Sequence, residues 1–297
     1  MTDQEVLAKK TAEAEEIVKR FLPKEEGHAK TLLSASNYSI TVGGKRLRPI
    51  IMRETYELLG GNGPEIDYFM AAMEMIHSSS LVHDDLPCMD NDEWRRGKRT
   101  TWYVYGEAMA TLAGDNLFVL PFETAAGAFS VTKDPARVGE AIRVLAHKTG
   151  QEGMIGGQSV DVELTDSETP LTLEQMEFIY HLKTGALLEG SMMIGAILAG
   201  ADEETVRKTE RIASCIGMAF QIRDDILDVI STTDKLGKPV LSDEKNHKTT
   251  YVSVYGLERA SEMVEEYSEE GIRLLAEIGG QGSFLESLFR MMISREK

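Results

Sequence analysis

Apolar residues recur at helical spacing along most of this 297-residue chain, and that pattern constrains its fold more than any other feature. In the segment 66–83, one helix face would carry Ile66, Met70, Met73, Ile76, His77 and Leu81, with Asp67 and Glu74 elsewhere on the wheel. Similar periods predict helices over Thr2–Phe21, Arg48–Leu59, Pro135–Lys148, Leu173–Leu182, Glu203–Val229, Glu258–Glu277 and Phe284–Ser294. Alternating Val, Ile and Thr runs, which are typical of strands, are almost absent. We therefore expect an all-α protein in which residues 1–297 form one domain.

Charge and composition exclude several classes of function. The sequence has 32 Lys and Arg residues against 49 Asp and Glu, a net charge of −17 at pH 7, whereas nucleic acids and anionic membranes require a basic surface. The charged N-terminus MTDQEVLAKK is unlike a signal peptide. The apolar run Gly190–Ala201 is shorter than the roughly 20 residues that span a bilayer, and predicts a buried helix. Cys88 and Cys215 suit a reducing compartment. We expect a cytoplasmic protein without nucleic-acid binding or stable membrane insertion.

Aspartates gather on one face of the predicted helix 203–229. At about 100° per residue, Gln221, Asp224, Asp225 and Asp228 share a stripe roughly 100° wide. The opposite side should pack, since it carries Phe220, Ile222, Ile226, Val229 and Ile230. Stacked carboxylates repel one another unless a cation lies between them, and Mg²⁺ prefers such oxygen ligands together with substrate phosphates. A solvated acidic face is the alternative.

A second acidic cluster, LVHDDLPCMDND at Leu81–Asp92, ends the predicted helix 66–83. His77 and Ser80 lie within about 40° of Asp84 on the helical wheel. Pro87 should disrupt the next turn, which leaves Asp90 free to return toward Asp84. The basic residues Arg95, Arg96, Lys98 and Arg99 follow at once. Surface ion pairs between these neighbouring acids and bases are the alternative to a binding site.

Two further segments suggest ligand binding. GGKRLRP at Gly43–Pro49 places Lys45 and Arg48 near a helix start, where backbone N–H groups and cationic side chains suit a phosphate. The polar stretch Asp234–His247 is the longest without apolar periodicity, and such loops are commonly lids.

Taken in order, these motifs resemble those of the all-trans short-chain prenyl diphosphate synthases of the bacterial farnesyl and geranylgeranyl type. The matching segments are GGKRLRP, EMIHSSSLVHDDLPCMDNDEWRRGK, AGDNLF, GMIGGQSVD, KTG, FQIRDDILD and GKPVLSDEKNHKTTY. The resemblance implies a single bundle of long helices around a deep central cavity, typically as a homodimer. Arg99 and Trp102 stand where the family usually has Pro and His, and Leu241 replaces a common Gly.

The resemblance also implies a role for individual residues. Asp84 and Asp90 would bind two Mg²⁺ ions, with Asp85 in the same motif, and Asp224 would bind a third; Mn²⁺ is an alternative metal. The allylic diphosphate would be held by Arg95, Lys183, Thr184, Gln221, Lys238 and Lys248. The diphosphate of the second substrate, isopentenyl diphosphate, would be held by Lys45, Arg48, His77 and Arg96. Catalysis would fall to Asp84, Asp85, Asp90, Lys183, Thr184, Gln221 and Asp224.

The implied reaction needs these metal ions and basic residues, because ionisation of the allylic substrate concentrates negative charge on the departing pyrophosphate. Ser79 and Ser80 are the expected chain-length residues: farnesyl-forming members typically carry an aromatic residue at the position of Ser79. Small side chains there predict elongation to geranylgeranyl diphosphate. In the alternative, a bulky residue such as Met75 or Met109 closes the tunnel at farnesyl diphosphate.

Two other functions within the same superfamily are alternatives. A terpene cyclase would normally lack the second DDxxD motif and the Lys45/Arg48 site. A non-catalytic subunit of a heteromeric synthase would typically lose the first aspartate cluster. This chain keeps all three features.

Overall fold

The computed structural model describes residues 2–165, 171–230 and 249–294, which divide into two compact units. Unit 1 comprises Met1–Arg143 with Ile197–Gly200, and unit 2 comprises Val144–Ala196 with Ala201–Lys297. Within the described ranges, the strands are limited to the short hairpin β1 (Trp94–Arg95) and β2 (Lys98–Arg99). The all-α prediction is confirmed. The prediction of a single domain stays a prediction.

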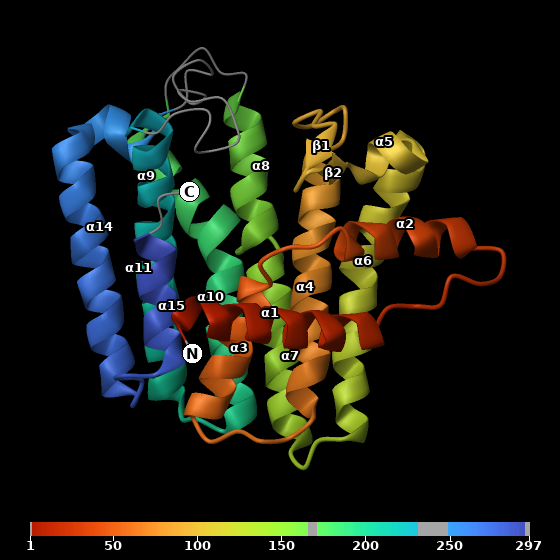
Figure 1. Ribbon diagram of the computed structural model, residues 1–297, viewed down its shortest axis with the longest axis horizontal. Helices are drawn as coiled ribbons and strands as arrows, with labels where there is room; N and C mark the ends of the chain where they lie inside the picture. Colours follow the sequence, from red (N-terminus) through yellow and green to blue (C-terminus); the bar gives the residue numbers. More distant parts are fainter. Residues whose placement is uncertain (1, 166–170, 231–248, 295–297) are drawn as a thin grey trace. The chain divides into compact units, whose positions relative to one another are not determined.

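Unit 1 is built around α4 (Glu65–Asp84), which is buried along most of its length. Figure 1 shows α6 (Glu107–Gly127) running beside it, and these two helices pack directly. Val18, Ile40, Ala71, Met75 and Leu117 form one buried cluster of this unit. The remaining elements are α1 (Asp3–Arg20), α2 (Lys30–Thr41), α3 (Leu47–Leu58), α5 (Thr101–Tyr105) and the 3₁₀ turn η1 (Ala128–Ser130). The helix α7 (Pro135–Thr149) begins in unit 1 and ends in unit 2.

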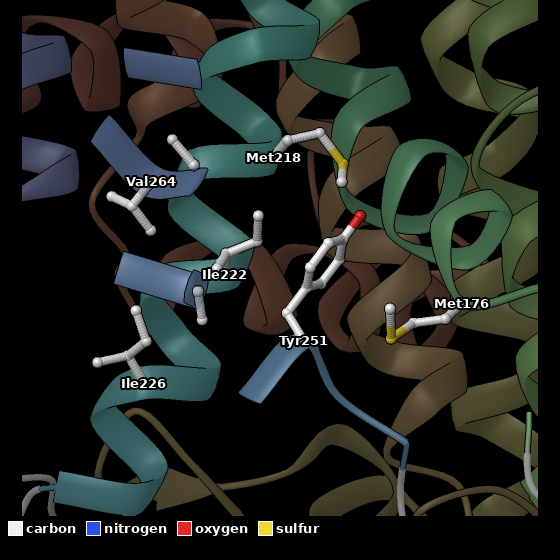
Figure 2. Close-up of a cluster of buried hydrophobic side chains, with 8 residues drawn as sticks. Met176, Met218, Ile222, Ile226, Tyr251 and Val264 are labelled. Atoms are coloured by element: carbon white, nitrogen blue, oxygen red, sulfur yellow. The ribbon is translucent and has the colours of Figure 1, made fainter. Parts of the chain in front are cut away.

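Unit 2 is built around α11 (Glu203–Ile230), which packs along α14 (Tyr251–Glu277). Figure 2 shows the apolar cluster between them, where Tyr251 and Met176 lie among residues of α11 and α14. The other elements are α8 (Met154–Thr165), α9 (Leu173–Ile179), the π-helix η2 (Tyr180–Gly185), α10 (Ala186–Ala199) and α15 (Phe284–Ile293).

The starts of α5 and α14 have the same local sequence and backbone pattern. Thr100 and Thr250 are N-caps, and the short helical segments after them end in Val-Tyr-Gly with Gly106 at φ 83° and Gly256 at φ 79°. Only glycine adopts this backbone conformation at little cost. The second glycine kinks α14, which explains why periodicity predicted a helix beginning only at Glu258.

The predicted helix Leu173–Leu182 is correct as far as Ile179, where the π-helix begins. Together α9, η2 and α10 make a continuous helical run, Leu173–Ala199, with the length and mean hydropathy (1.3) of a membrane span. The run is longer than the segment Gly190–Ala201 considered above. Because 78% of its most apolar window is buried within the protein, it resembles the core helix of a globular domain.

Candidate functional site

Basic residues line a cavity of about 410 Å³ in unit 1. Its walls come from the loop before α3, the start of α3, the middle of α4 and the end of the β1–β2 hairpin. The lining residues are Val42, Gly44, Lys45, Arg46, Leu47, Arg48, Glu74, His77 and Arg96. The structure thus brings together the four residues predicted to hold the second diphosphate, Lys45, Arg48, His77 and Arg96. Their role as ligands remains a prediction.

Close packing of backbone and guanidinium shapes this cavity. The Arg96 guanidinium donates a hydrogen bond to the Gly43 carbonyl. A Cβ atom on Gly44 would lie 2.6 Å from Nη1 of Arg96, which is too close for any other residue without movement. Gly44 therefore lets the Arg96 side chain lie against the loop that carries Lys45.

His77 is kept neutral in this basic surrounding. Burial lowers the pKa of His77 well below its ordinary value of 6.5, and the charges of Arg48 and Arg96 lower it further. Arg48 Nη1 lies 3.3 Å from His77 Nε2. Because a guanidinium can only donate, Nε2 must accept, and the ring proton belongs on Nδ1. Burial also lowers the pKa of Arg48 to about 10, which leaves it charged at neutral pH.

The first aspartate motif turns back on itself at the end of α4. The backbone N–H of Asp90 donates to the carbonyl of Asp84 over 2.8 Å, so Asp90 returns to Asp84 as the sequence predicts. Asp85 is only 3% exposed and accepts from Nε of Arg95 at 2.7 Å. Burial raises the pKa of the Asp85 carboxyl, and the charge of Arg95 opposes this rise. Asp85 therefore anchors Arg95.

Arg99 in β2 and Trp102 in α5 are the two residues of unit 1 that depart from the family pattern, and both make contacts close to the first aspartate motif. The Arg99 guanidinium lies 4.1 Å from the ring centre of Trp94 and 3.8 Å from that of Tyr103. Trp102 donates from Nε1 to the carbonyl of Asp92 over 2.8 Å. Both residues thus stabilise the loop rather than disturb it.

In unit 2, the π-helix presents the Lys183-Thr184 pair to two neighbouring helices. Lys183 Nζ lies 2.5 Å from an oxygen of Asp161 on α8, and Thr184 donates to the side-chain carbonyl of Gln221 on α11 over 3.2 Å. A Cβ on Gly157 would lie 2.4 Å from the backbone nitrogen of Lys183, so α8 approaches the π-helix through this glycine. One-turn π-helices are frequently found at functional sites.

The second aspartate motif is largely buried on α11. Asp225 and Asp228 are each 3% exposed, which contradicts the alternative of a solvated acidic face, whereas Asp224 is partly exposed. Tyr180 donates to Asp225 over 3.0 Å, and so does the backbone N–H of Tyr251. Asp225 therefore joins the π-helix, α11 and the start of α14.

The apolar side of α11 is packed only in part. Ile222 and Ile226 are buried, as predicted, but Val229 and Ile230 are 44% and 53% exposed. The prediction that both pack was wrong, because they lie in the last turn of the helix.

The chain-length residues lie in the part of α4 that contacts α6. Ser79 is fully buried and its hydroxyl donates to the Gly114 carbonyl over 2.8 Å, whereas the Ser80 hydroxyl returns to the carbonyl of His77. The buried Ser78 hydroxyl has no hydrogen-bond partner within the described ranges. The chain-length role of Ser79 and Ser80 stays a prediction.

Lys238, Lys248 and the whole of the predicted lid lie outside the described residues. The two aspartate motifs lie in different units, so their joint action on one substrate also stays a prediction.

Sequence reasoning missed the residues that surround the predicted ones. These are the ion pair of Arg46 and Glu74, which lines the cavity in unit 1, and Asp161, Tyr180 and Tyr251, which bond to Lys183 and Asp225 in unit 2. Glu74 was assigned to a side of the helix away from the apolar face, yet it is 1% exposed. Its position three residues before His77, on an otherwise apolar helix, was the available signal.

Comparisons with known proteins agree with these motifs. A family model described as "Polyprenyl synthetase" matches residues 29–275. A farnesyl diphosphate synthase of Geobacillus stearothermophilus is 40% identical over 289 residues, covering 95% of this chain and 94% of that one. A chloroplastic geranylgeranyl pyrophosphate synthase of Capsicum annuum is 45% identical over 236 residues, covering 80% of this chain and 63% of the relative's length.

Solved structures give the same result. The crystal structure of an FPP/GFPP synthase from Zymomonas mobilis has a TM-score of 0.87 at 31% identity, covering 98% of this chain and 99% of that chain. The predicted family resemblance is confirmed. The chain belongs to the polyprenyl synthetase family.

Proposed function

We propose that the protein is a trans-prenyltransferase of the farnesyl/geranylgeranyl diphosphate synthase type. It condenses isopentenyl diphosphate head-to-tail with an allylic diphosphate and releases pyrophosphate. The observation that carries this proposal is the basic cavity of unit 1, where Lys45, Arg48 and Arg96 surround a space of about 410 Å³. His77 in its wall and Asp84 of the first aspartate motif lie on the same helix, about 10 Å apart along its axis. An anion site and a carboxylate site thus occur together.

In this proposal, the cavity holds the diphosphate of isopentenyl diphosphate. Lys45, Arg48 and Arg96 supply charge, and neutral His77 orients Arg48 by accepting its hydrogen bond. The allylic diphosphate is held by a second set of residues: Arg95, Lys183, Thr184, Gln221, Lys238 and Lys248.

The chemistry of the donor set fits Mg²⁺. Asp84, Asp90 and Asp224 offer hard carboxylate oxygens. Within the described ranges, no three His, Cys, Asp or Glu side chains form a complete metal site by themselves. This agrees with the way Mg²⁺ is usually bound, by one or two carboxylates together with substrate phosphates. We propose three Mg²⁺ ions, with Mn²⁺ as the alternative; when bound, they would neutralise the charge of the leaving pyrophosphate.

Arg95 and Lys183 would also neutralise the negative charge that develops on the leaving pyrophosphate. In the ligand-free protein their partners are Asp85 and Asp161, at 2.7 and 2.5 Å. These ion pairs keep Arg95 and Lys183 charged and oriented before the substrate arrives. Binding of the allylic diphosphate would then draw both cations away from the two carboxylates.

The carbon–carbon bond then forms without a covalent enzyme intermediate. Cleavage of the allylic C–O bond leaves a carbocation and pyrophosphate. The double bond of isopentenyl diphosphate attacks this cation, and the adduct loses a proton to pyrophosphate, which re-forms a double bond. Water must be excluded because it would quench the cation; we propose the segment 234–248 as the lid.

We propose geranylgeranyl diphosphate as the final product. The motivation is the small side chain of Ser79 at the position where farnesyl-forming relatives typically carry an aromatic ring. The alternative, closure of the tunnel by Met75 or Met109, gives farnesyl diphosphate.

Product analysis tests both the function and the chain length. Purified protein is incubated with Mg²⁺, excess isopentenyl diphosphate and, separately, dimethylallyl, geranyl or farnesyl diphosphate. The expected product is geranylgeranyl diphosphate from each primer. Termination at farnesyl diphosphate would refute the chain-length proposal alone, whereas the absence of condensation with all three primers would refute the function.

A pair of variants sharpens the chain-length test. Ser79→Tyr should shorten the product, and Ser80→Tyr should shorten it less, because Ser79 is fully buried whereas Ser80 is partly exposed. Product lengths that do not change in Ser79→Tyr, with an unchanged circular dichroism spectrum, would contradict the role of Ser79.

The two alternative functions give different results in the same assay. A terpene cyclase would release a hydrocarbon or alcohol, and a non-catalytic subunit would be inactive without a partner. We also propose a cytoplasmic homodimer. Sedimentation at the 32.9 kDa of one chain would contradict the dimer.

A further inference from the structure

The cavity of unit 1 contains one carboxylate among four cationic side chains. Lys45, Arg46, Arg48 and Arg96 all line it, and Glu74 is the single acidic residue among the lining residues that the structure describes. We propose that Glu74 is a built-in counter-ion of this anion site: it balances the basic residues while the site is empty and thereby sets the affinity for diphosphate. This inference rests on the proposed function, because it concerns the same cavity.

Glu74 is tied to one of these cations in a buried ion pair. Nη1 of Arg46 lies 2.5 Å from Oε1 of Glu74, and the two side chains are 1% and 2% exposed. Nη2 of Arg46 donates to the carbonyl of Ile40, at the end of α2. Glu74 therefore acts on the loop before α3 through Arg46, and it is a positioning residue rather than a catalytic one.

The loop depends on this anchor. Arg46 has φ 50°, a left-handed conformation that is uncommon outside glycine, and it is the N-cap of α3. Arg48 follows two residues later, in the first turn of α3. The position of the Arg48 guanidinium in the cavity is thus coupled to the Arg46–Glu74 pair.

Two of the guanidinium groups also have a donor left over. Nε of Arg46 and Nε of Arg48 are buried without a hydrogen-bond partner within the described ranges. Buried donors are normally paired, so each of these groups can serve a further acceptor. Guanidinium groups remain charged in proteins, and His77 is neutral. Among the lining residues that the structure describes, Glu74 is therefore the one group that offsets mutual repulsion of the cations before an anion arrives.

If Glu74 is a counter-ion, removing its charge should have an effect on anion binding that removing a merely structural residue would not have. Glu74→Gln keeps the size and the acceptor oxygen but removes the charge. The variant should unfold at a lower temperature without ligand, because four cations are then uncompensated. An anion should restore what is lost, so the stabilisation by pyrophosphate should be larger than in the wild type.

The experiment is a titration of inorganic pyrophosphate, followed by thermal unfolding and by calorimetry. EDTA is present so that the aspartate motifs cannot recruit pyrophosphate through a metal. We expect roughly ten-fold tighter binding to Glu74→Gln, equivalent to about 1.4 kcal/mol. In turnover assays the KM for isopentenyl diphosphate should fall, with little change in the KM for the allylic substrate. Equal or weaker pyrophosphate binding would overturn the proposal.

Two further variants separate charge from folding. Glu54→Gln is the matched control, since Glu54 pairs with Lys10 at 2.5 Å in the same unit but outside the cavity. It should change stability without changing pyrophosphate affinity. The double variant Arg46→Met/Glu74→Met removes one charge of each sign and replaces a buried pair by apolar side chains, a change that proteins often tolerate.

The double variant keeps the net charge of the cavity, so it should bind pyrophosphate no more tightly than the wild type does. It also keeps the proposal testable if Glu74→Gln fails to fold, because tighter binding in the double variant, where no net charge is gained, would overturn the counter-ion role. A wild type that binds pyrophosphate but does not condense prenyl substrates would refute the proposed function and leave this inference standing.

Discussion

Tyr251 places a hydroxyl group where it costs free energy, and removing that group should stabilise the protein. The residue is fully buried at the start of α14, in the apolar cluster with Met176 and Met218 that Figure 2 shows. Its hydroxyl oxygen has no hydrogen-bond partner within the described ranges. Burial raises the pKa of Tyr251 far above its ordinary value of 10.0, so the group stays a neutral phenol.

The expected gain follows from the unpaired hydroxyl. A buried polar group without a partner costs about 1–3 kcal/mol relative to its hydrated state. Tyr251→Phe removes this cost and keeps the ring, whose packing against Tyr180 at 5.6 Å between ring centres is unaffected. We expect the free energy of unfolding to rise by about 1 kcal/mol, which corresponds to roughly 2–4 °C in Tm for a protein of this size.

Urea unfolding at neutral pH measures this change directly. Tyr56→Phe is the matched control, because the Tyr56 hydroxyl donates to Glu65 over 2.8 Å and accepts from the backbone N–H of Gly63 over 2.6 Å. The control should lose about 1 kcal/mol. If Tyr251→Phe were destabilised as much as Tyr56→Phe, the hydroxyl would have a partner in solution and the reasoning would be refuted.

Further predictions concern the site. Asp84→Ala and Asp224→Ala should each lower kcat by several orders of magnitude with an unchanged circular dichroism spectrum, since each removes a proposed metal ligand; near-normal turnover would refute that assignment. Gly157→Ala should cost about 1–3 kcal/mol in urea unfolding, because its Cβ would lie 2.4 Å from the nitrogen of Lys183; unchanged stability would show that α8 can move away. Because the folded-state pKa of His77 lies well below the ordinary 6.5, only the unfolded chain gains this proton as the pH falls below 6.5. Its contribution is a loss of stability of up to about 1.4 kcal/mol per pH unit in that range; His77→Gln should flatten this slope, and identical slopes would contradict the buried neutral ring.

The periodicity of the sequence predicted most of the long helices, and it failed for α2, α6 and α8. Helix α4 extends from Glu65 to Asp84, one residue beyond the predicted segment at each end. In α6, by contrast, small and apolar residues surround the helix, so no period marks it. The helix α8 was not predicted for the same reason. The kink at Gly256 comes from the local conformation of that glycine, whereas the π-helix is held by tertiary contacts of Lys183 and Thr184 with α8 and α11 that no local pattern shows.

The candidate site was predictable in its charged residues and not in their partners. Lys45, Arg48, His77 and Arg96 stand out in the sequence as basic or titratable residues within motifs. Glu74 did not, because a carboxylate on a helix is usually solvated, and its burial depends on Arg46 reaching it from the loop before α3. Such pairs form only after the chain folds, so spacing along the sequence does not show them.

The π-helix Tyr180–Gly185 joins α9 to α10, and its length determines which side chains of α9 lie on the same face as those of α10. Deleting one residue from it would restore α-helical spacing and turn α9 by about 100° relative to α10. Met176 would then leave the apolar cluster, and Lys183 could no longer face Asp161 while Thr184 faces Gln221. The number of residues in this segment is therefore under as strong a constraint as their identity, and it should tolerate substitution better than insertion or deletion.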